Sequence, residues 1–178
     1  MIFLRLIPYI LLFFAVTAAP FLVHHVAPPK VLNGCQIQPR TQCRERDLAR
    51  MDLTKSDLRK ADLSRSLLAE ARLTKADLAK ANLTGANLTN AKVGGARLRA
   101  ANLSGANLTG ASFREANLKR ANLRGANLTR TNFRDAQLIG ADLTGAKLNE
   151  TKLIGAYLSG VTWVDGRQCA SSSIGECR

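Results

Sequence analysis

The chain has 178 residues, and its 26 lysines and arginines against 13 acidic residues give a formal net charge of +13 at pH 7. This length is that of a single domain. The charge favours partners with negative charge. The two histidines, His24 and His25, lie near the amino terminus, so the central region has no histidine base for acid–base catalysis. We therefore expect a protein that is not an enzyme and that needs no cofactor.

The amino-terminal residues have the pattern of an export signal. Arg5 precedes an apolar run from Leu6 to Val16, and Ala18 and Ala19 supply the small residues that a signal peptidase requires. We predict that residues 1–19 are a signal peptide. The alternative is an uncleaved anchor over about residues 7–23, which would be the only membrane contact we expect. Both interpretations predict an exported protein, periplasmic or secreted, that belongs to the cell envelope.

A repeat of five residues begins after this segment. From Leu48 to Trp163 every fifth residue is large and apolar, over 24 successive positions, of which 20 are leucine. The other four are Val93, Phe113, Phe133 and Trp163. In 17 of the 24 cases the residue two places earlier is alanine. The recurring unit is therefore Ala-(Asp/Asn)-Leu-x-x.

A period of five fits neither regular secondary structure. Five residues rotate an α-helix by about 500°, so the leucines would spiral around it. In a straight strand an odd step sends successive leucines to opposite faces. A short extended piece, however, places Ala and Leu on one side and the intervening Asp or Asn on the other. If the remaining two residues turn a corner, the chain forms a coil with short sides and an apolar interior.

A second period of 20 residues indicates how many sides each coil has. The sequence Gly-Ala-Asn-Leu-Thr at 85–89 recurs at 105–109 and at 125–129, and Gly145 continues the series. Four units per coil would stack these glycines at one corner, where a turn with positive φ favours glycine. Duplication of 20-residue blocks is an alternative origin of the period, and it is compatible with the same coil.

The repeats over residues 47–163 resemble those of the pentapeptide-repeat family. This resemblance implies an all-β fold, namely a right-handed quadrilateral parallel β-helix, here with about six coils. The segment from Trp163 to Cys177 is also similar to an ending found on exported members of the family. Phe113 and Phe133 lie one coil apart, so we expect them to stack in the core rather than to bind a ligand.

The four cysteines form two pairs of equal spacing, one at each end of the repeats: Cys35 with Cys43, and Cys169 with Cys177. An even number in an exported protein indicates disulfides. We expect each pair to close locally, because a rod of six coils separates its ends by far more than the 7 Å that a disulfide spans. The same separation argues against a zinc site. Residues 20–46 and 164–178 would then be caps on the two ends.

Basic residues concentrate on two of the four expected faces. We name them by their first leucines: the Leu53 face includes Leu53, Leu73, Val93, Phe113, Phe133 and Leu153, and the Leu58 face includes Leu58, Leu78, Leu98, Leu118, Leu138 and Leu158. The candidate anion-contacting residues are Arg72, Lys75 and Lys92 on the Leu53 face, and Arg59, Lys60, Lys80, Arg97, Arg99, Lys119 and Arg120 on the Leu58 face. A surface that is merely solvated is the alternative.

These observations favour a non-enzymatic structural or interaction module of the envelope, a monomer whose partner is an unidentified protein or an anionic envelope polymer. Some members of the family resemble B-form DNA and bind topoisomerases such as gyrase. A DNA mimic of this length would need on the order of 17 net negative charges, so this alternative is disfavoured. A rod that binds nucleic acid is also disfavoured, because Tyr157 alone could stack on bases. The column that contains Asp62 and Asn82 is mostly neutral, so we expect hydrogen bonds there rather than calcium.

Overall fold

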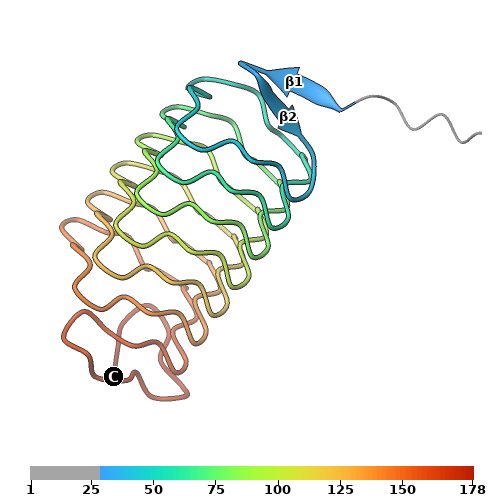
Figure 1. The fold of residues 1–178 in the computed structure, drawn as a ribbon. Helices are drawn as coiled ribbons and strands as arrows, with labels where there is room; N and C mark the ends of the chain where they lie inside the picture. Colours follow the sequence, from blue (N-terminus) through green and yellow to red (C-terminus); the bar gives the residue numbers. More distant parts are fainter. Residues whose placement is uncertain (1–28) are drawn as a thin grey trace, which may run out of the picture.

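The computed structural model describes residues 29–178, which wind into a stack of coils (Figure 1). A short hairpin lies at the amino-terminal end of the stack, and the carboxyl-terminal segment lies at the other end. The predicted signal peptide, its cleavage and the alternative anchor fall outside the described residues. Within the described residues, no helix has the length and apolar character needed to cross a membrane.

The coils are joined by parallel β-bridges between residues that are 20 apart. The series runs from the pair Gln42 and Asp62 to the pair Asp142 and Thr162. Each coil therefore contains four five-residue units, which confirms the prediction from the 20-residue period. Hydrogen bonds run in both directions between coils: the Leu48 amide donates to the Leu67 carbonyl at 2.7 Å, and the Leu67 amide donates to the Arg46 carbonyl at 2.9 Å.

The interior is a ladder of leucines and alanines. The central residues from Leu48 to Leu143 are at most 1% exposed, and most of the small residues two places earlier are also buried. The rings of Phe113 and Phe133 stack with centroids 5.3 Å apart, as expected from their spacing of one coil. Three hydroxyls that replace alanine in the described units donate to a carbonyl; for example, Thr131 donates to Leu108 at 2.8 Å. The core is thus continuous along the rod and free of charged side chains.

Every corner of the coil is a tight turn whose third residue has positive φ. In the turn after Leu48, for example, the amide of Met51 donates to the carbonyl of Leu48 at 3.2 Å, and Arg50 between them has a φ of 59°. A positive φ at this place is typical of a type II turn. The glycine column at residues 85, 105, 125 and 145 has this conformation, as predicted. The conformation is not confined to glycine, however, because most corners hold a charged residue or Asn.

Ala100 offers a simple test of the strain at these corners. Its φ is 55°, a region that costs an L-residue about 1–2 kcal/mol, whereas glycine enters it freely. After the greater chain entropy of glycine is subtracted, Ala100→Gly should raise the free energy of unfolding by about 0.5–1 kcal/mol. Chemical denaturation measures the change. Gly105→Ala is the matched reverse, because no atom lies within 4 Å of the added Cβ, and a gain in stability there would contradict the explanation.

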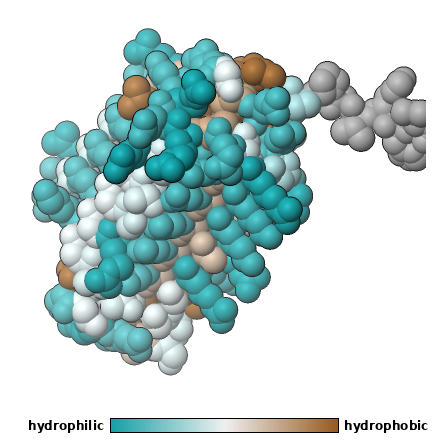
Figure 2. All heavy atoms as spheres, viewed as in Figure 1, coloured by the Kyte–Doolittle hydropathy of each residue, from teal (hydrophilic) through white to brown (hydrophobic). Residues whose placement is uncertain are grey.

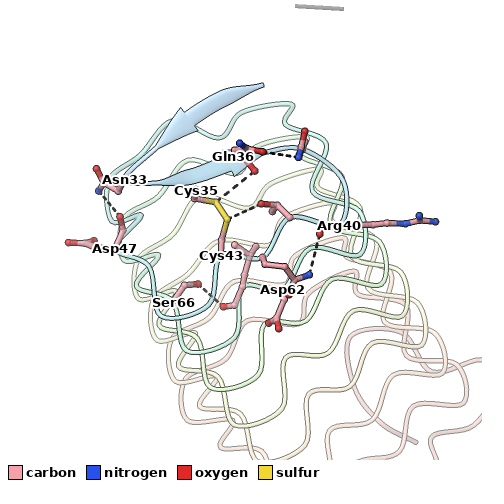
Figure 3. Close-up of a disulfide and its surroundings, with 12 residues drawn as sticks. Asn33, Cys35, Gln36, Arg40, Cys43, Asp47, Asp62 and Ser66 are labelled. Atoms are coloured by element: carbon pink, nitrogen blue, oxygen red, sulfur yellow. Dashed lines mark hydrogen bonds between the residues drawn. A yellow bond between two sulfur atoms is a disulfide. The ribbon is translucent and has the colours of Figure 1, made fainter. Parts of the chain in front are cut away.

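The amino-terminal cap is a hairpin of two short strands, β1 (Lys30–Leu32) and β2 (Cys35–Ile37), which pair antiparallel. Asn33 and Gly34 connect them with φ values of 46° and 73°, as a two-residue type I′ turn requires. The side chain of Asn33 donates to the carbonyl of Asp47 at 2.6 Å (Figure 3). The hairpin is thereby attached to the first coil.

A disulfide joins this hairpin to the core of the stack. Cys35 and Cys43 are bonded, with Cα atoms 5.4 Å apart, and both are fully buried (Figure 3). Cys43 lies five residues before Leu48, and its amide donates to the carbonyl of Asp62 at 2.8 Å. It therefore occupies the central position of a repeat unit at residues 41–45. The coil begins one unit earlier than the leucine pattern indicates.

The carboxyl-terminal cap folds back over the last coil. Antiparallel bridges join Tyr157 to Ile174 and Thr162 to Gln168, in place of a further parallel layer. The second disulfide, between Cys169 and Cys177, holds this segment with Cα atoms 4.9 Å apart. Both cysteine pairs therefore close locally, as the sequence predicts, and each lies in a cap that covers an open end of the stack.

Candidate anion-binding face

The Leu58 face brings together the larger group of predicted basic residues. Its outward positions present Arg97 at the middle of a side and Arg59, Lys60, Lys80, Arg99, Lys119 and Arg120 in the turns that follow the central leucines. Bridged neighbours in adjacent coils lie about 4.8 Å apart, so these turns form a row along the long axis. The molecular surface shows hydrophilic residues in such rows over most of the visible side (Figure 2).

Five cations in this row have no acidic partner. Within residues 29–178, no ion pair involves Lys60, Lys80, Arg99, Lys119 or Arg120. Residues 1–28 contain neither Asp nor Glu, so that segment offers no acidic side chain. Uncompensated charges of one sign along a row produce a positive potential that attracts anions.

The two acidic residues of the Leu58 face lie in its first two coils. Asp57 accepts from Arg59 at 2.8 and 2.6 Å through its two oxygens. This side-chain hydrogen bond lowers the pKa of Asp57 and raises the pKa of Arg59. The carboxylate of Asp77 lies 3.6 Å from the guanidinium of Arg97, which is exposed, so this ion pair is longer than that between Asp57 and Arg59. The positive potential is therefore strongest from Lys80 toward Arg120.

Two hollows open at the same edge of the Leu58 face. One, of about 420 Å³, is lined by Pro39, Arg40, Arg59 and Lys60. The other, of about 400 Å³, is lined by Arg99, Asn117, Lys119, Arg120 and Ile139. They lie 60 residues, or three coils, apart, which corresponds to about 14 Å along the axis. Arg40 belongs to this row, and the position of Cys43 in the five-residue register could have revealed it.

The predicted residues of the Leu53 face form a smaller adjacent group. Arg72 and Lys92 are bridged neighbours at the middle of that side. Lys75 lies at the corner between the two faces, and its side chain passes 3.5 Å from the place where a Cβ on Gly95 would lie. The structure therefore makes the two basic faces contiguous, with Lys75 at their border.

Most units use the outward residue before the central leucine to cap the next turn. In fourteen units an Asp or Asn oxygen at this place accepts from the amide two residues later, as Asn117 does from Lys119 at 3.2 Å. These bonds confirm the role expected for this column, although among residues 29–178 only Asn82 also donates to its bridged neighbour, Asp62 in the preceding coil. Arg72, Lys92 and Arg97 occupy the same position and cannot accept such a bond.

At position 97 the turn therefore lacks the side-chain cap that Asp or Asn would provide, and the surface has a positive charge instead. Arg97→Asn should restore the cap on the Arg99 amide and raise the free energy of unfolding by about 0.5–1 kcal/mol. The same change should weaken binding to a polyanion about fivefold, because one basic residue near an anionic surface contributes about 1 kcal/mol. Denaturation and binding assays on the same protein measure the two effects.

Asn117 provides the reverse substitution, since it is bridged to Arg97 one coil further along. Asn117→Arg should remove a cap, lower stability and strengthen binding. If stability and affinity rise together or fall together within each variant, the explanation that position 97 gains a charge at the expense of a turn cap is wrong.

The outward carboxylates are scattered rather than clustered. Within residues 29–178, no group of three or more His, Cys, Asp or Glu side chains could hold a metal ion. Asp62 and Asp142 are half-buried, and burial alone would raise the pKa of each. Hydrogen bonds from the following turn and a nearby arginine outweigh burial and lower it. These carboxylates therefore serve as turn caps in their ionised form.

The fold defines the class of protein: a repeat solenoid with an apolar ladder inside and a charged surface outside. The chain matches the family model described as pentapeptide repeats at residues 66–105, 94–130 and 126–162, which together cover more than half of it. The chain belongs to the pentapeptide-repeat family. No curated protein matches it significantly.

Solved structures of pentapeptide-repeat proteins are among the matches. A protein from Nostoc Pcc 7120 is 41% identical over 45% of this chain and 66% of its own, with a TM-score of 0.45. A protein from the thylakoid lumen of Arabidopsis thaliana is 27% identical over 65% of this chain and 82% of its own, with a TM-score of 0.30. QnrB1, described as a plasmid-mediated fluoroquinolone resistance protein, is 16% identical over 75% and 82%, with a TM-score of 0.42.

Proposed function

We propose that this protein is a non-enzymatic interaction module of the cell envelope that binds an anionic polymer or membrane surface through its Leu58 face, with the Leu53 face adjoining. The observation that carries the proposal is the row of five cations that form no ion pair within residues 29–178. Right-handed winding, which the family resemblance implies, and about six coils, which the repeat units give at four per coil, belong to the same proposal. The rod then serves to hold these charges at a fixed spacing of one coil.

Export to the periplasm or beyond is the second part of the proposal. The apolar run and small residues over residues 1–19 support it, as does a disulfide in each cap. Disulfides persist in oxidising compartments and are rare in the cytosol. Anionic polysaccharides and lipid headgroups are the abundant polyanions of such a compartment.

Topoisomerase protection by DNA mimicry is the alternative that the family suggests. Duplex DNA carries one negative charge per roughly 1.7 Å, and a mimic must reproduce that density. Here the two acidic residues of the Leu58 face, Asp57 and Asp77, form ion pairs with Arg59 and Arg97. The charges of this face that are left without a partner are positive. The charge pattern therefore favours an anionic partner rather than a protein that normally binds DNA.

The test compares two variants with equal loss of charge. One replaces Arg97, Arg99, Lys119 and Arg120 with glutamine; the other replaces Arg44, Arg65, Arg124 and Arg130, which pair with acids on the other faces, with glutamine. Binding to an immobilised sulfated polysaccharide is measured as a function of salt. The first variant should lose affinity about a hundredfold or more and show a shallower dependence on salt, and the second should retain most of its affinity.

Equal losses in the two variants would show that net charge alone controls binding, and the proposed face would be wrong. Absence of binding by the wild-type protein to polysaccharide, anionic vesicles and duplex DNA alike would reject the proposed function. Strong preference for duplex DNA over the other two would replace it with nucleic-acid binding.

A further inference from the structure

The Leu58 face changes from cationic to apolar toward its carboxyl-terminal end. Its outward column at the middle of the side consists of Asp57, Asp77, Arg97, Asn117, Gln137, Tyr157 and Ile174, in the order in which the coils stack. Tyr157 and Ile174 are bridged neighbours, and they are 48% and 55% exposed. Partners in a bridge point to the same side of a sheet, so both side chains extend outward from the same face as Arg97.

Two further isoleucines border this apolar end. Ile154, 65% exposed, lies at the turn that leads into the last side of the Leu58 face, three residues before Tyr157. Ile139 lines the hollow formed with Arg99, Lys119 and Arg120. Cationic and apolar side chains are therefore contiguous on one face of the rod.

Among residues 29–178, the other large apolar residues that are strongly exposed do not form such a group. Val31 lies in strand β1 at the opposite end of the rod. Leu67 lies on the side that contains Leu48 and Leu68, opposite the Leu58 face, and its bridged neighbours are Asp47 and Asn87. Exposed apolar residues that occur singly are normal, whereas a contiguous group beside unpaired charges indicates an interaction site.

We infer that the Leu58 face lies on the surface of an anionic lipid bilayer, with its cations over the headgroups and Tyr157, Ile174 and Ile154 inserted at the interface. This inference rests on the proposed function and specifies the partner. Basic residues attract a surface of anionic lipids, and apolar side chains beside them add binding by entering the boundary between headgroups and acyl chains. Tyrosine suits that boundary because its ring is apolar and its hydroxyl is polar.

The apolar end distinguishes a bilayer from a soluble polyanion. A polysaccharide rich in sulfate or carboxylate would use the cations but would leave the isoleucines and most of the Tyr157 ring exposed to water. A bilayer uses both parts of the face at once. The row of cations spans about three coils and the apolar group lies beyond its end, so one flat surface can contact both.

The experiment uses vesicles of phosphatidylcholine with 30 mol% phosphatidylglycerol. Wild type and all variants are purified in the same exported form, so any contribution of residues 1–28 to vesicle binding is the same in each. The test variant combines Ile154→Ser, Tyr157→Ser and Ile174→Ser. The control variant combines Val31→Ser and Leu67→Ser, which removes exposed apolar residues from other parts of the rod. Sedimentation with vesicles and binding to the sulfated polysaccharide are measured for both.

The test variant should bind the vesicles at least tenfold more weakly than wild type and should bind the polysaccharide unchanged, while the control binds both normally. Vesicle binding that is unaffected by the three substitutions overturns the inference. Wild-type binding to polysaccharide without binding to vesicles overturns it too, and leaves the proposed function intact. If the wild-type protein binds neither the vesicles nor the polysaccharide, both the inference and the proposed function are rejected. A circular-dichroism spectrum and melting curve like those of the wild type exclude unfolding as the cause.

A fluorescent reporter tests insertion directly. Tyr157→Trp in a Trp163→Phe background places a single tryptophan at the apolar end, and Leu67→Trp in the same background places it on the opposite face. Lipids brominated in their acyl chains should quench the first reporter several times more strongly than the second. Equal quenching, or none at either site, contradicts the orientation that we infer.

Discussion

Replacing Phe133 with alanine should reduce the free energy of unfolding by about 3–5 kcal/mol, the range found for the loss of a fully buried aromatic side chain. Phe133 has no exposed surface, and its ring stacks on that of Phe113. The substitution therefore removes burial, leaves a cavity in the middle of the ladder, and deprives Phe113 of a neighbour. Equilibrium denaturation monitored by circular dichroism measures the loss.

Tyr157→Ala is the matched control, because this aromatic residue lies outside the core and should change stability by less than about 1 kcal/mol. Similar losses at the two positions would mean that the interior is less tightly packed than the structure indicates. Each coil contacts only its neighbours, so Phe133→Ala should also increase hydrogen exchange most in the coils that contain Phe113 and Leu153.

Removing the disulfide between Cys35 and Cys43 should lower the free energy of unfolding by about 2.6 kcal/mol, from the entropy of a nine-residue loop alone. Because both cysteines are also buried, the double variant Cys35→Ala/Cys43→Ala should lose somewhat more. The released hairpin would uncover the first coil, and uncovered coil ends favour association between molecules. Denaturation and light scattering measure the two effects.

A second variant separates the crosslink from the packing at Cys43. Cys35→Ala/Cys43→Leu removes the same disulfide but places leucine at the central position of the first unit, directly next to Leu63 in the ladder. It should recover about 1–2 kcal/mol relative to the double alanine variant, because a buried leucine contributes that much more than alanine. No recovery would show that the cap, rather than continuation of the ladder, determines the environment of Cys43.

The repeats could be predicted from sequence because one physical requirement recurs in every unit. Burial of the central residue and of the alanine before it fixes which side chains point inward, and the glycine series fixes four units per coil. The stacking of Phe113 on Phe133 follows from the same register. Each of these predictions depends on the hydrophobic pattern, which is the strongest signal in the chain. The two local disulfides were predicted from the number of cysteines and from the length of the rod between the two pairs.

The corners were harder to predict because their conformation opposes residue preference. The sequence indicates positive φ only where glycine occurs, but Lys60 and Glu70 adopt it as well, with φ values of 58° and 59°. The cost of about 1–2 kcal/mol per residue is offset by the turn hydrogen bonds and by the buried residues on both sides. Such compensation is a property of the closed coil and is not visible in any single unit.

The two ends lack the repeat, so their pairing depended on local signals. Asn33-Gly34 is a strong hairpin signal, since both residues accept positive φ, yet its short flanking strands show no alternation that would extend it. The antiparallel bridge between Tyr157 and Ile174 has no precedent in the repeats, and it is this bridge that completes the apolar end of the Leu58 face. The cationic part of that face could be predicted from sequence, and its apolar part could not.

The fixed count of four units per coil restricts how the gene can change length without altering the surface. Loss of a single unit, for example residues 106–110, would leave every leucine pointing inward but would turn all later residues by one side. Lys119 and Arg120 would then follow the Leu53 face and no longer continue the row from Arg99. Insertions and deletions that preserve the row must therefore occur in blocks of twenty residues, and the 20-residue similarity in the sequence has that length.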